Sequence, residues 1–156
     1  MAERATPTTN PVGPRRPRTR REAEYWAECE SLATLYRGLH PEWPSDEVSY
    51  GVSTVCQWLW DRCWGFCTHA DLHGAELFWE YLVDHPYRST YDARVIASAV
   101  AGFLGYLGLT GAVSQGTADR LQRQANAEAE AWLRLGAGEM GATEMLQRIR
   151  RCRDAA

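Results

Sequence analysis

The residue types that most invite chemistry lie near the middle of the chain, where thiols and imidazoles follow one another closely. Cys63, Cys67, His69 and His73 belong to the classes of side chain that bind zinc. Their spacing does not favour a zinc site, because the single residue between Cys67 and His69 cannot reverse the chain and close a tetrahedron. On a continuous helix, Cys56 lies within about 40° of Cys63 and Cys67. We therefore expect these thiols to pack as small hydrophobic residues, and we predict no cofactor.

A second metal site is conceivable on the next predicted helix. His69, His73, Glu76 and Glu80 fall on one face if that helix begins early. Such a face can hold a metal in a carboxylate-rich bundle, but it then needs matching ligands on other helices. A solvated face of an amphipathic helix accounts for the same pattern. We take the solvated face as the main interpretation and keep a metal-binding helical bundle that uses His69, His73 and Glu76 as the alternative.

Motifs of established enzymes are missing from this sequence. There is no nucleophile elbow, no phosphate-binding loop and no HExxH pair of histidines. The glycines at 102, 105, 108 and 111 do not follow a predicted strand, so they do not form a dinucleotide-binding fingerprint. We therefore expect a protein that binds rather than one that catalyses.

Charge is distributed unevenly along the chain, and every basic residue is arginine. Residues 1–21 carry six arginines against one glutamate, in a segment rich in proline and threonine that we expect to be disordered on its own. A second basic cluster lies near the C-terminus. Dense arginine favours contact with nucleic acid or with an acidic partner. The residues predicted to make that contact are Arg15, Arg16, Arg18, Arg20, Arg21, Arg148, Arg150, Arg151 and Arg153.

Residues 22–93 form a strongly acidic segment, with thirteen carboxylates against three arginines. This segment also holds most of the tryptophans, a residue type that is over-represented at binding hot spots. We predict a protein-binding surface here that uses Trp43, Trp58 and Trp60.

Hydrophobic periodicity and capping residues predict helices almost throughout, and strand patterns are nearly absent. The first helix presents an apolar face from Tyr25 to Leu39, and Ser45 is a good N-cap for the second, in which Trp58 lies off the apolar face. The helix over 114–135 has a narrow apolar stripe of small residues, which consists of Ala118, Leu121, Ala125, Ala129 and Trp132. The predicted helices cover residues 21–39, 45–67, 70–84, a central segment, 114–135 and 143–153. The fold class is all-α, a compact bundle of five main helices plus a short C-terminal helix. We divide the chain into a basic tail (1–20), a bundle (21–136) and an arginine-rich C-terminal segment (137–156).

The central segment, residues 95–113, is uncharged and rich in glycine. It either crosses a membrane or forms the buried central helix of the bundle. A cap at Ser89, Thr90 or Asp92 and an end at Gly108 or Gly111 leave a helix of about 15 residues, or about 22 Å, which is shorter than the roughly 30 Å hydrocarbon layer. We predict a buried helix whose glycines let its neighbours approach closely, and a small single-span membrane protein remains the alternative.

The cysteine count and the N-terminus bear on location. Five cysteines are an odd number, and no apolar stretch follows the first charges. This pattern favours reduced thiols in the cytoplasm. Taken together, the sequence predicts a non-enzymatic helical binding protein, a regulator or adaptor, with a protein partner expected, nucleic acid as a further partner and no membrane partner.

Overall fold

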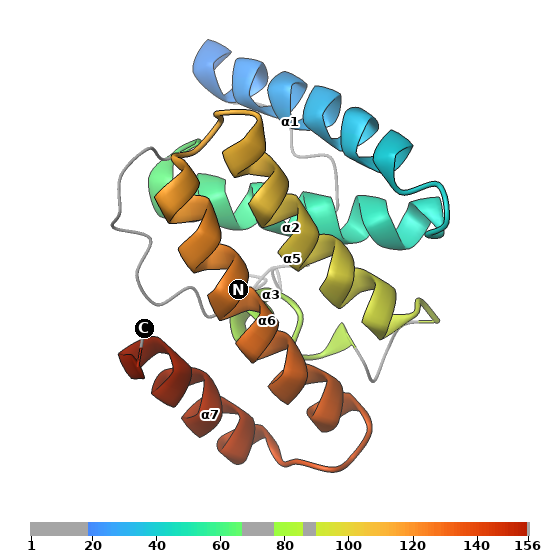
Figure 1. The fold of residues 1–156 in the computed structure, drawn as a ribbon, viewed down its shortest axis with the longest axis vertical. Coiled ribbons are helices and arrows are strands. Elements are labelled where there is room, and N and C mark those ends of the chain that lie inside the picture. Colours follow the sequence, from blue (N-terminus) through green and yellow to red (C-terminus); the bar gives the residue numbers. More distant parts are fainter. Residues whose placement is uncertain (1–18, 67–76, 86–89, 156) are drawn as a thin grey trace, which may run out of the picture.

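The computed structural model describes residues 19–66, 77–85 and 90–155, and within these ranges the chain is helical and contains no strand. The helices are α1 (Arg20–Leu39), α2 (Ser45–Cys63), α3 (Leu77–Tyr81), α5 (Ala93–Leu109), α6 (Gln115–Gly136) and α7 (Ala142–Ala155) (Figure 1). The predicted all-α fold is confirmed.

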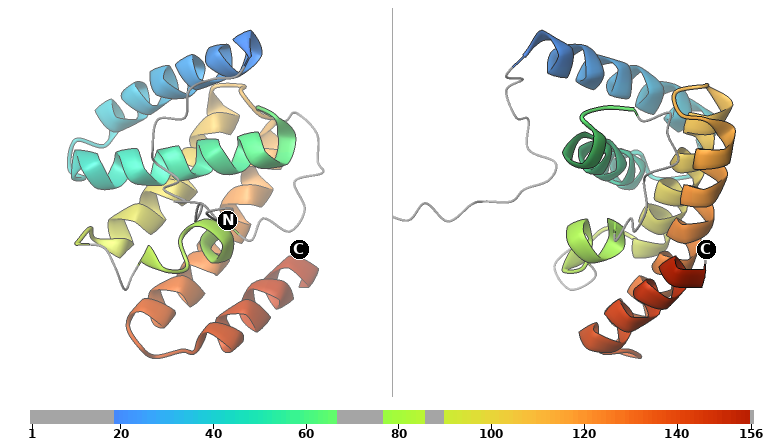
Figure 2. Two further views of the ribbon diagram at one scale, coloured as in Figure 1. Left: turned by 180° about the vertical axis from the view of Figure 1, so that it is seen from behind. Right: turned by 90° about the vertical axis from the view of Figure 1, so that its left-hand side faces the viewer.

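Helix α5 lies at the centre of this arrangement. It packs along α6 on one side and against α2 on another, and these are the two most extensive helix contacts in the described chain. Helix α1 crosses one end of the molecule, where it rests on α2, and α7 packs against α6 at the opposite end (Figures 1 and 2). The buried central helix predicted from the sequence is therefore α5.

Side chains cap three of the helices where free backbone N–H groups need acceptors. Thr19 accepts a hydrogen bond from the Glu22 N–H at the start of α1. Asp92 accepts a hydrogen bond from a backbone N–H at the start of α5, and Ser114 does so at the start of α6. Asp92 is one of the three caps predicted for the central helix. Ser45 is instead the first residue of α2, because Pro44 occupies the cap position and no side chain caps that helix.

Helix α2 ends earlier than the sequence pattern predicts, at Cys63 rather than at residue 67. Trp64 turns into the left-handed region with a φ of 60°, and its N–H bonds to the Trp60 carbonyl. The backbone of Gly65 also has a positive φ, of 139°. Of the helix predicted over 70–84, the described part contains only the short α3. Helix α5 ends at Leu109, and Gly111 follows the C-cap Thr110 with a positive φ of 76°, so the predicted glycine end is confirmed.

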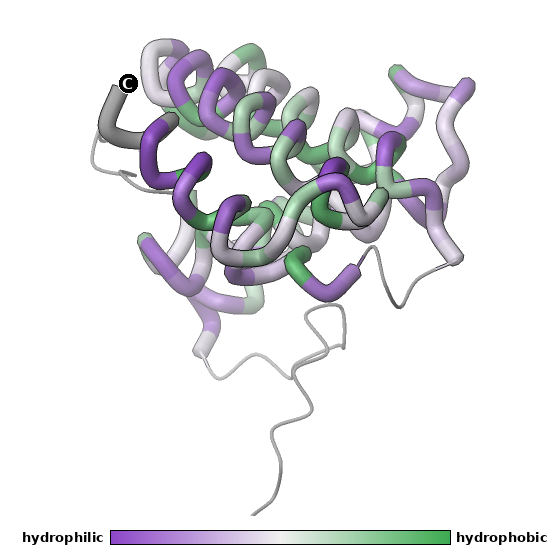
Figure 3. The backbone as a smooth tube through the Cα atoms, turned by 90° about the horizontal axis from the view of Figure 1, so that it is seen from below, coloured by the Kyte–Doolittle hydropathy of each residue, from purple (hydrophilic) through white to green (hydrophobic). Residues whose placement is uncertain are grey.

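The core draws apolar side chains from every described helix. Hydrophobic and hydrophilic residues alternate along each helix, so that each one has an apolar side (Figure 3). The predicted stripe of α6 is entirely buried and consists of Ala118, Leu121, Ala125, Ala129 and Trp132. Met145 and Ile149 of α7 belong to the same core, with exposed fractions of 0% and 1%. The C-terminal segment is thus packed on the bundle. The division predicted from the sequence placed a boundary between the two after residue 136.

Buried polar contacts tie the short α3 segment to α6. The carboxylate of Glu128, which is fully buried, accepts hydrogen bonds from the Phe78 N–H and from the side chain of Gln124. The indole N–H of Trp132 donates to the carbonyl of Leu82 over 2.6 Å. Buried polar groups cost stability unless they are paired, so these bonds fix the position of α3 along α6.

Two glycines of α5 permit close helix contacts. A Cβ on Gly108 would lie 2.5 Å from the Cβ of Ala118 on α6, and a Cβ on Gly102 would overlap the hydroxyl of Tyr36 on α1. Both glycines are needed because any larger residue would push a neighbouring helix away. The prediction that these glycines allow close approach is confirmed for α6. Toward α2 the glycine is Gly51, on α2 itself, which packs against Ala99.

The membrane alternative has no support in the described helices. None of them combines the length and the apolar character that a membrane span requires.

Candidate functional site: a groove between α1, α5 and α6

The tryptophans predicted as interface residues occupy three different environments. Trp58 is only 1% exposed and lies in the core, so it is not part of the surface. Trp43 is half-buried and stacks on the ring of His40, with ring centroids 4.2 Å apart. Trp60 is half-buried beside Tyr25, at a centroid distance of 5.2 Å. Only Trp43 and Trp60 therefore remain available to a partner.

Trp64 is a surface tryptophan that the sequence reasoning missed. Its side chain is 68% exposed and meets Trp60 edge to face. The sequence pattern placed it inside a continuing helix, whereas the left-handed turn at this residue points it outward. The one signal available was the glycine that follows it, which is typical of a helix end.

The arginine clusters are described only in part. Arg15, Arg16 and Arg18 lie outside the described residues, as does the side chain of Arg153 in α7. Arg20 and Arg21 are exposed on the first turn of α1, and Arg20 pairs with Glu24 at 3.0 Å.

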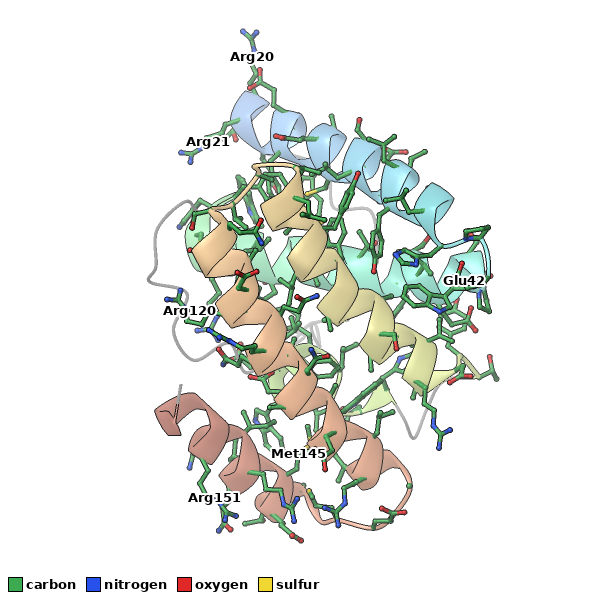
Figure 4. All side chains as sticks on the ribbon, viewed as in Figure 1. Arg20, Arg21, Glu42, Arg120, Met145 and Arg151 are labelled. Carbon is green, nitrogen blue, oxygen red and sulfur yellow. The ribbon has the colours of Figure 1, made fainter. Side chains whose placement is uncertain are left out.

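On α7, Arg150 and Arg151 are exposed, and Arg148 pairs with Glu144 at 3.6 Å. Figure 4 shows Arg21, Arg120 and Arg151, which come from three helices, along the same edge of the molecule.

The residues of the metal alternative, His69, His73 and Glu76, lie outside the described residues. Within the part of the chain that the structure describes, no group of three or more potential metal ligands is found.

The described surface contains a groove of about 270 Å³ between the end of α1, the second half of α5 and the start of α6. The helices bring together side chains that lie far apart in the sequence. The lining residues are Tyr36, Leu39, His40, Gly102, Gly105, Tyr106, Leu109, Gln115, Asp119 and Gln122.

Hydrogen bonds to the backbone of α5 hold the walls of this groove in place. The Tyr36 hydroxyl donates to the Ala99 carbonyl over 3.2 Å, and burial raises the pKa of this phenol. The side-chain amide of Gln122 donates to the Ala101 carbonyl over 3.1 Å. Because Gly105 has no side chain, the Gln122 amide can lie directly against α5. The groove is therefore built from fixed groups on three helices.

Exposed leucines stand around the groove. Leu39 and Leu109 line it with exposed fractions of 62% and 79%. Leu35, one turn earlier on α1, is 60% exposed but lines a separate hollow on that helix. The sequence pattern placed Leu39 on the buried face of its helix, which is wrong: Tyr36 in the same turn is buried, whereas Leu39, the last residue of α1, is exposed. Leu35 does not lie on that apolar face, and its position was the one sign in the sequence that α1 carries an exposed leucine.

The groove is acidic at its polar positions. Asp119 is the carboxylate among its lining residues, and it accepts a hydrogen bond from Gln115 at 2.8 Å. His40 contacts the carboxylate of Glu42 at 3.2 Å. The pKa of Glu42 is lowered by its own backbone N–H and then by His40, so this carboxylate stays ionised. No arginine is among the described lining residues.

A hollow that combines exposed leucines and tyrosine rings with several polar side chains is suited to holding a side chain of another molecule. Comparison of the chain with protein-family models, with curated proteins and with solved structures found no match.

Proposed function

We propose that this chain is a non-enzymatic helical binding protein, a regulator or adaptor, that docks a protein partner in the groove between α1, α5 and α6. The observation that carries the proposal is the position of the exposed leucines. Five large hydrophobic residues are exposed in the described chain, and two of them, Leu39 and Leu109, line the groove. Single exposed leucines are ordinary, but two from different helices at one hollow are typical of an interaction site.

The acidic segment predicted to bind protein contributes one wall of this groove through α1. Trp43 lies behind His40 in that wall, and Trp60 and Trp64 form a separate aromatic surface near the end of α2. The leucine groove and the tryptophan surface are thus two separate candidate surfaces for a protein partner.

Purification of a tagged chain with its native partner, followed by reconstitution of the pair, tests this function. Replacing both Leu39 and Leu109 by glutamate should weaken binding by about 30-fold or more, since each leucine that anchors an interface is worth at least about 1 kcal/mol. Ala23→Glu is the matched control, because Ala23 is exposed near the start of α1 and lines neither the groove nor the second hollow of that helix. A reconstituted complex that the leucine variant leaves unchanged would exclude the groove as its docking site.

The arginines support a second binding function, toward nucleic acid or an acidic partner. The supporting observation is that Arg148, Arg150 and Arg151 lie within one turn of α7, and that Arg151 lies on the edge shared with Arg21 (Figure 4). If each neutralises one phosphate, changing all three to glutamine should reduce the salt dependence of duplex DNA binding by about 2.7 in log–log slope. Fluorescence anisotropy over a salt series measures that slope. Binding that does not respond to salt would refute an electrostatic contact.

A further inference from the structure

The volume and the lining of the groove indicate which kind of side chain it can hold, and this inference rests on the function proposed above. Its volume of about 270 Å³ exceeds the roughly 150 Å³ of an engineered cavity that binds benzene. One large apolar side chain therefore fits, with the Tyr36 and Tyr106 rings as walls and Leu109 over its edge. The fit predicts a leucine, phenylalanine or methionine as the anchor of the partner.

The charges around the groove select among partners with such an anchor. Asp119 lines the groove itself. Glu42 contacts His40, which is another lining residue. Both acidic residues are exposed, so a partner can reach them. Asp119 accepts a hydrogen bond on Oδ1 from the side chain of Gln115. Its other oxygen can therefore accept a further donor from a ligand.

We propose that the groove binds an amphipathic helix of a partner protein in which arginine or lysine lies one turn from a large apolar anchor. On such a helix, residues three and four positions apart share a face, so the anchor and the basic residue approach the groove together. Arginine can bond to a carboxylate through two parallel N–H groups. Charge complementarity of this kind sets the choice of partner and the rate of association more than it sets affinity.

A second copy of this chain suits the groove less well. A symmetric pair places the same surface patch on both sides of the contact. Asp119 and Glu42 of the two copies would then meet across one interface, and like charges at an interface oppose binding. Helix α1 also offers no arginine at the groove, because Arg37 bonds to Ser49 on α2 at 2.6 Å.

The test uses the full chain and a set of synthetic helical peptides with one apolar stripe of leucines. The peptides differ only in the residues beside the stripe, which are arginine, glutamine or glutamate. Fluorescence anisotropy at low salt should give binding of the arginine peptide about fivefold tighter than the glutamine peptide, because two exposed ion pairs are worth about 1 kcal/mol together. The glutamate peptide should bind most weakly.

Two variants assign this effect to the groove. Asp119→Asn should reduce the preference for arginine to about twofold, since one of the two ion pairs is removed. Glu130→Gln is the matched control, because Glu130 is exposed on the same helix and does not line the groove. Leu109→Ala should weaken all the peptides by a similar factor.

The outcomes separate this inference from the function on which it rests. Equal affinity for the arginine and glutamate peptides, with Leu109→Ala still weakening both, would overturn the inference and leave groove docking intact. Binding of no peptide would overturn both. A dimer in light scattering that Leu109→Glu dissociates would overturn the inference in favour of a second copy.

Discussion

The contact between Gly102 and Tyr36 provides the sharpest test of how α1 is held on α5. The Tyr36 hydroxyl occupies the space where a side chain at position 102 would begin, and it donates a hydrogen bond to the Ala99 carbonyl. The rest of the tyrosine ring leaves more room, since its Cζ would lie 3.4 Å from an added Cβ. The conflict created by Gly102→Ala therefore involves one oxygen atom, and Tyr36→Phe removes that atom.

The magnitudes follow from this geometry. Gly102→Ala gains about 1 kcal/mol of helix propensity but loses about 1–3 kcal/mol to overpacking and about 1 kcal/mol for the displaced hydrogen bond, a net loss of about 1–3 kcal/mol. Tyr36→Phe alone loses about 1 kcal/mol with its hydrogen bond. In the double variant the clash is gone, and the propensity gain of about 1 kcal/mol offsets the missing bond. The coupling between the two sites should be about 2–4 kcal/mol.

Urea denaturation followed by circular dichroism measures the free energy of unfolding for the four proteins of this cycle. Gly116→Ala on α6 serves as the control, because a Cβ there meets nothing within 4 Å and should not destabilise the chain. A Gly102→Ala protein as stable as this control would refute the argument. Additive effects of the two substitutions would show that the hydroxyl is not the atom in conflict.

Three further predictions concern buried side chains. Burial lowers the pKa of His85 below its ordinary 6.5. Below pH 6.5 the unfolded chain therefore binds a proton at His85 more readily than the folded chain does, so the free energy of unfolding should fall as the pH drops below 6.5. His85→Phe should flatten this decline in a pH series of urea denaturations, and an unchanged decline would contradict it. Trp132→Phe should lower stability by about 2 kcal/mol, because the Leu82 carbonyl loses its buried donor; a change in the urea midpoint too small to resolve would count against that bond. A hydrogen bond to Cys29, together with burial, raises the pKa of the Cys56 thiol. Iodoacetamide at mildly alkaline pH should therefore modify Cys56 much more slowly in the folded chain than in urea, as mass spectrometry of digests can show, and equal rates would refute the buried pair.

Most of the helical framework could be predicted because its signals are local. Capping side chains such as Asp92 and Ser114 determine where α5 and α6 begin, and they act on backbone groups within three residues. Apolar periodicity then identified the buried stripe of α6. The end of α2 was missed because a left-handed residue at Trp64 is decided by packing beyond that helix and has no strong local signal.

The candidate site could not be predicted to the same degree, since it depends on how three helices cross. Tyr36, Gly105 and Gln122 are far apart in the sequence, and no pattern in the chain brings them to one groove. The tryptophans show the same limit. Helical periodicity placed Trp58 off the apolar face of α2, but α2 is covered on more than one side, so this tryptophan is buried.

The glycine-rich stretch of α5 links the stability of this chain to its proposed binding site. Gly102 lets Tyr36 lie on α5, and Gly105 does the same for the Gln122 amide, so both glycines make room for side chains that line the groove. The exposed leucines at the edge make no comparable contribution to the core, since Leu109 is 79% exposed. Substitutions in the floor therefore act first on folding, whereas substitutions at the edge act on binding with little effect on stability. If replacing an edge leucine weakens partner binding while the chain stays stably folded, the loss can therefore be assigned to the groove itself.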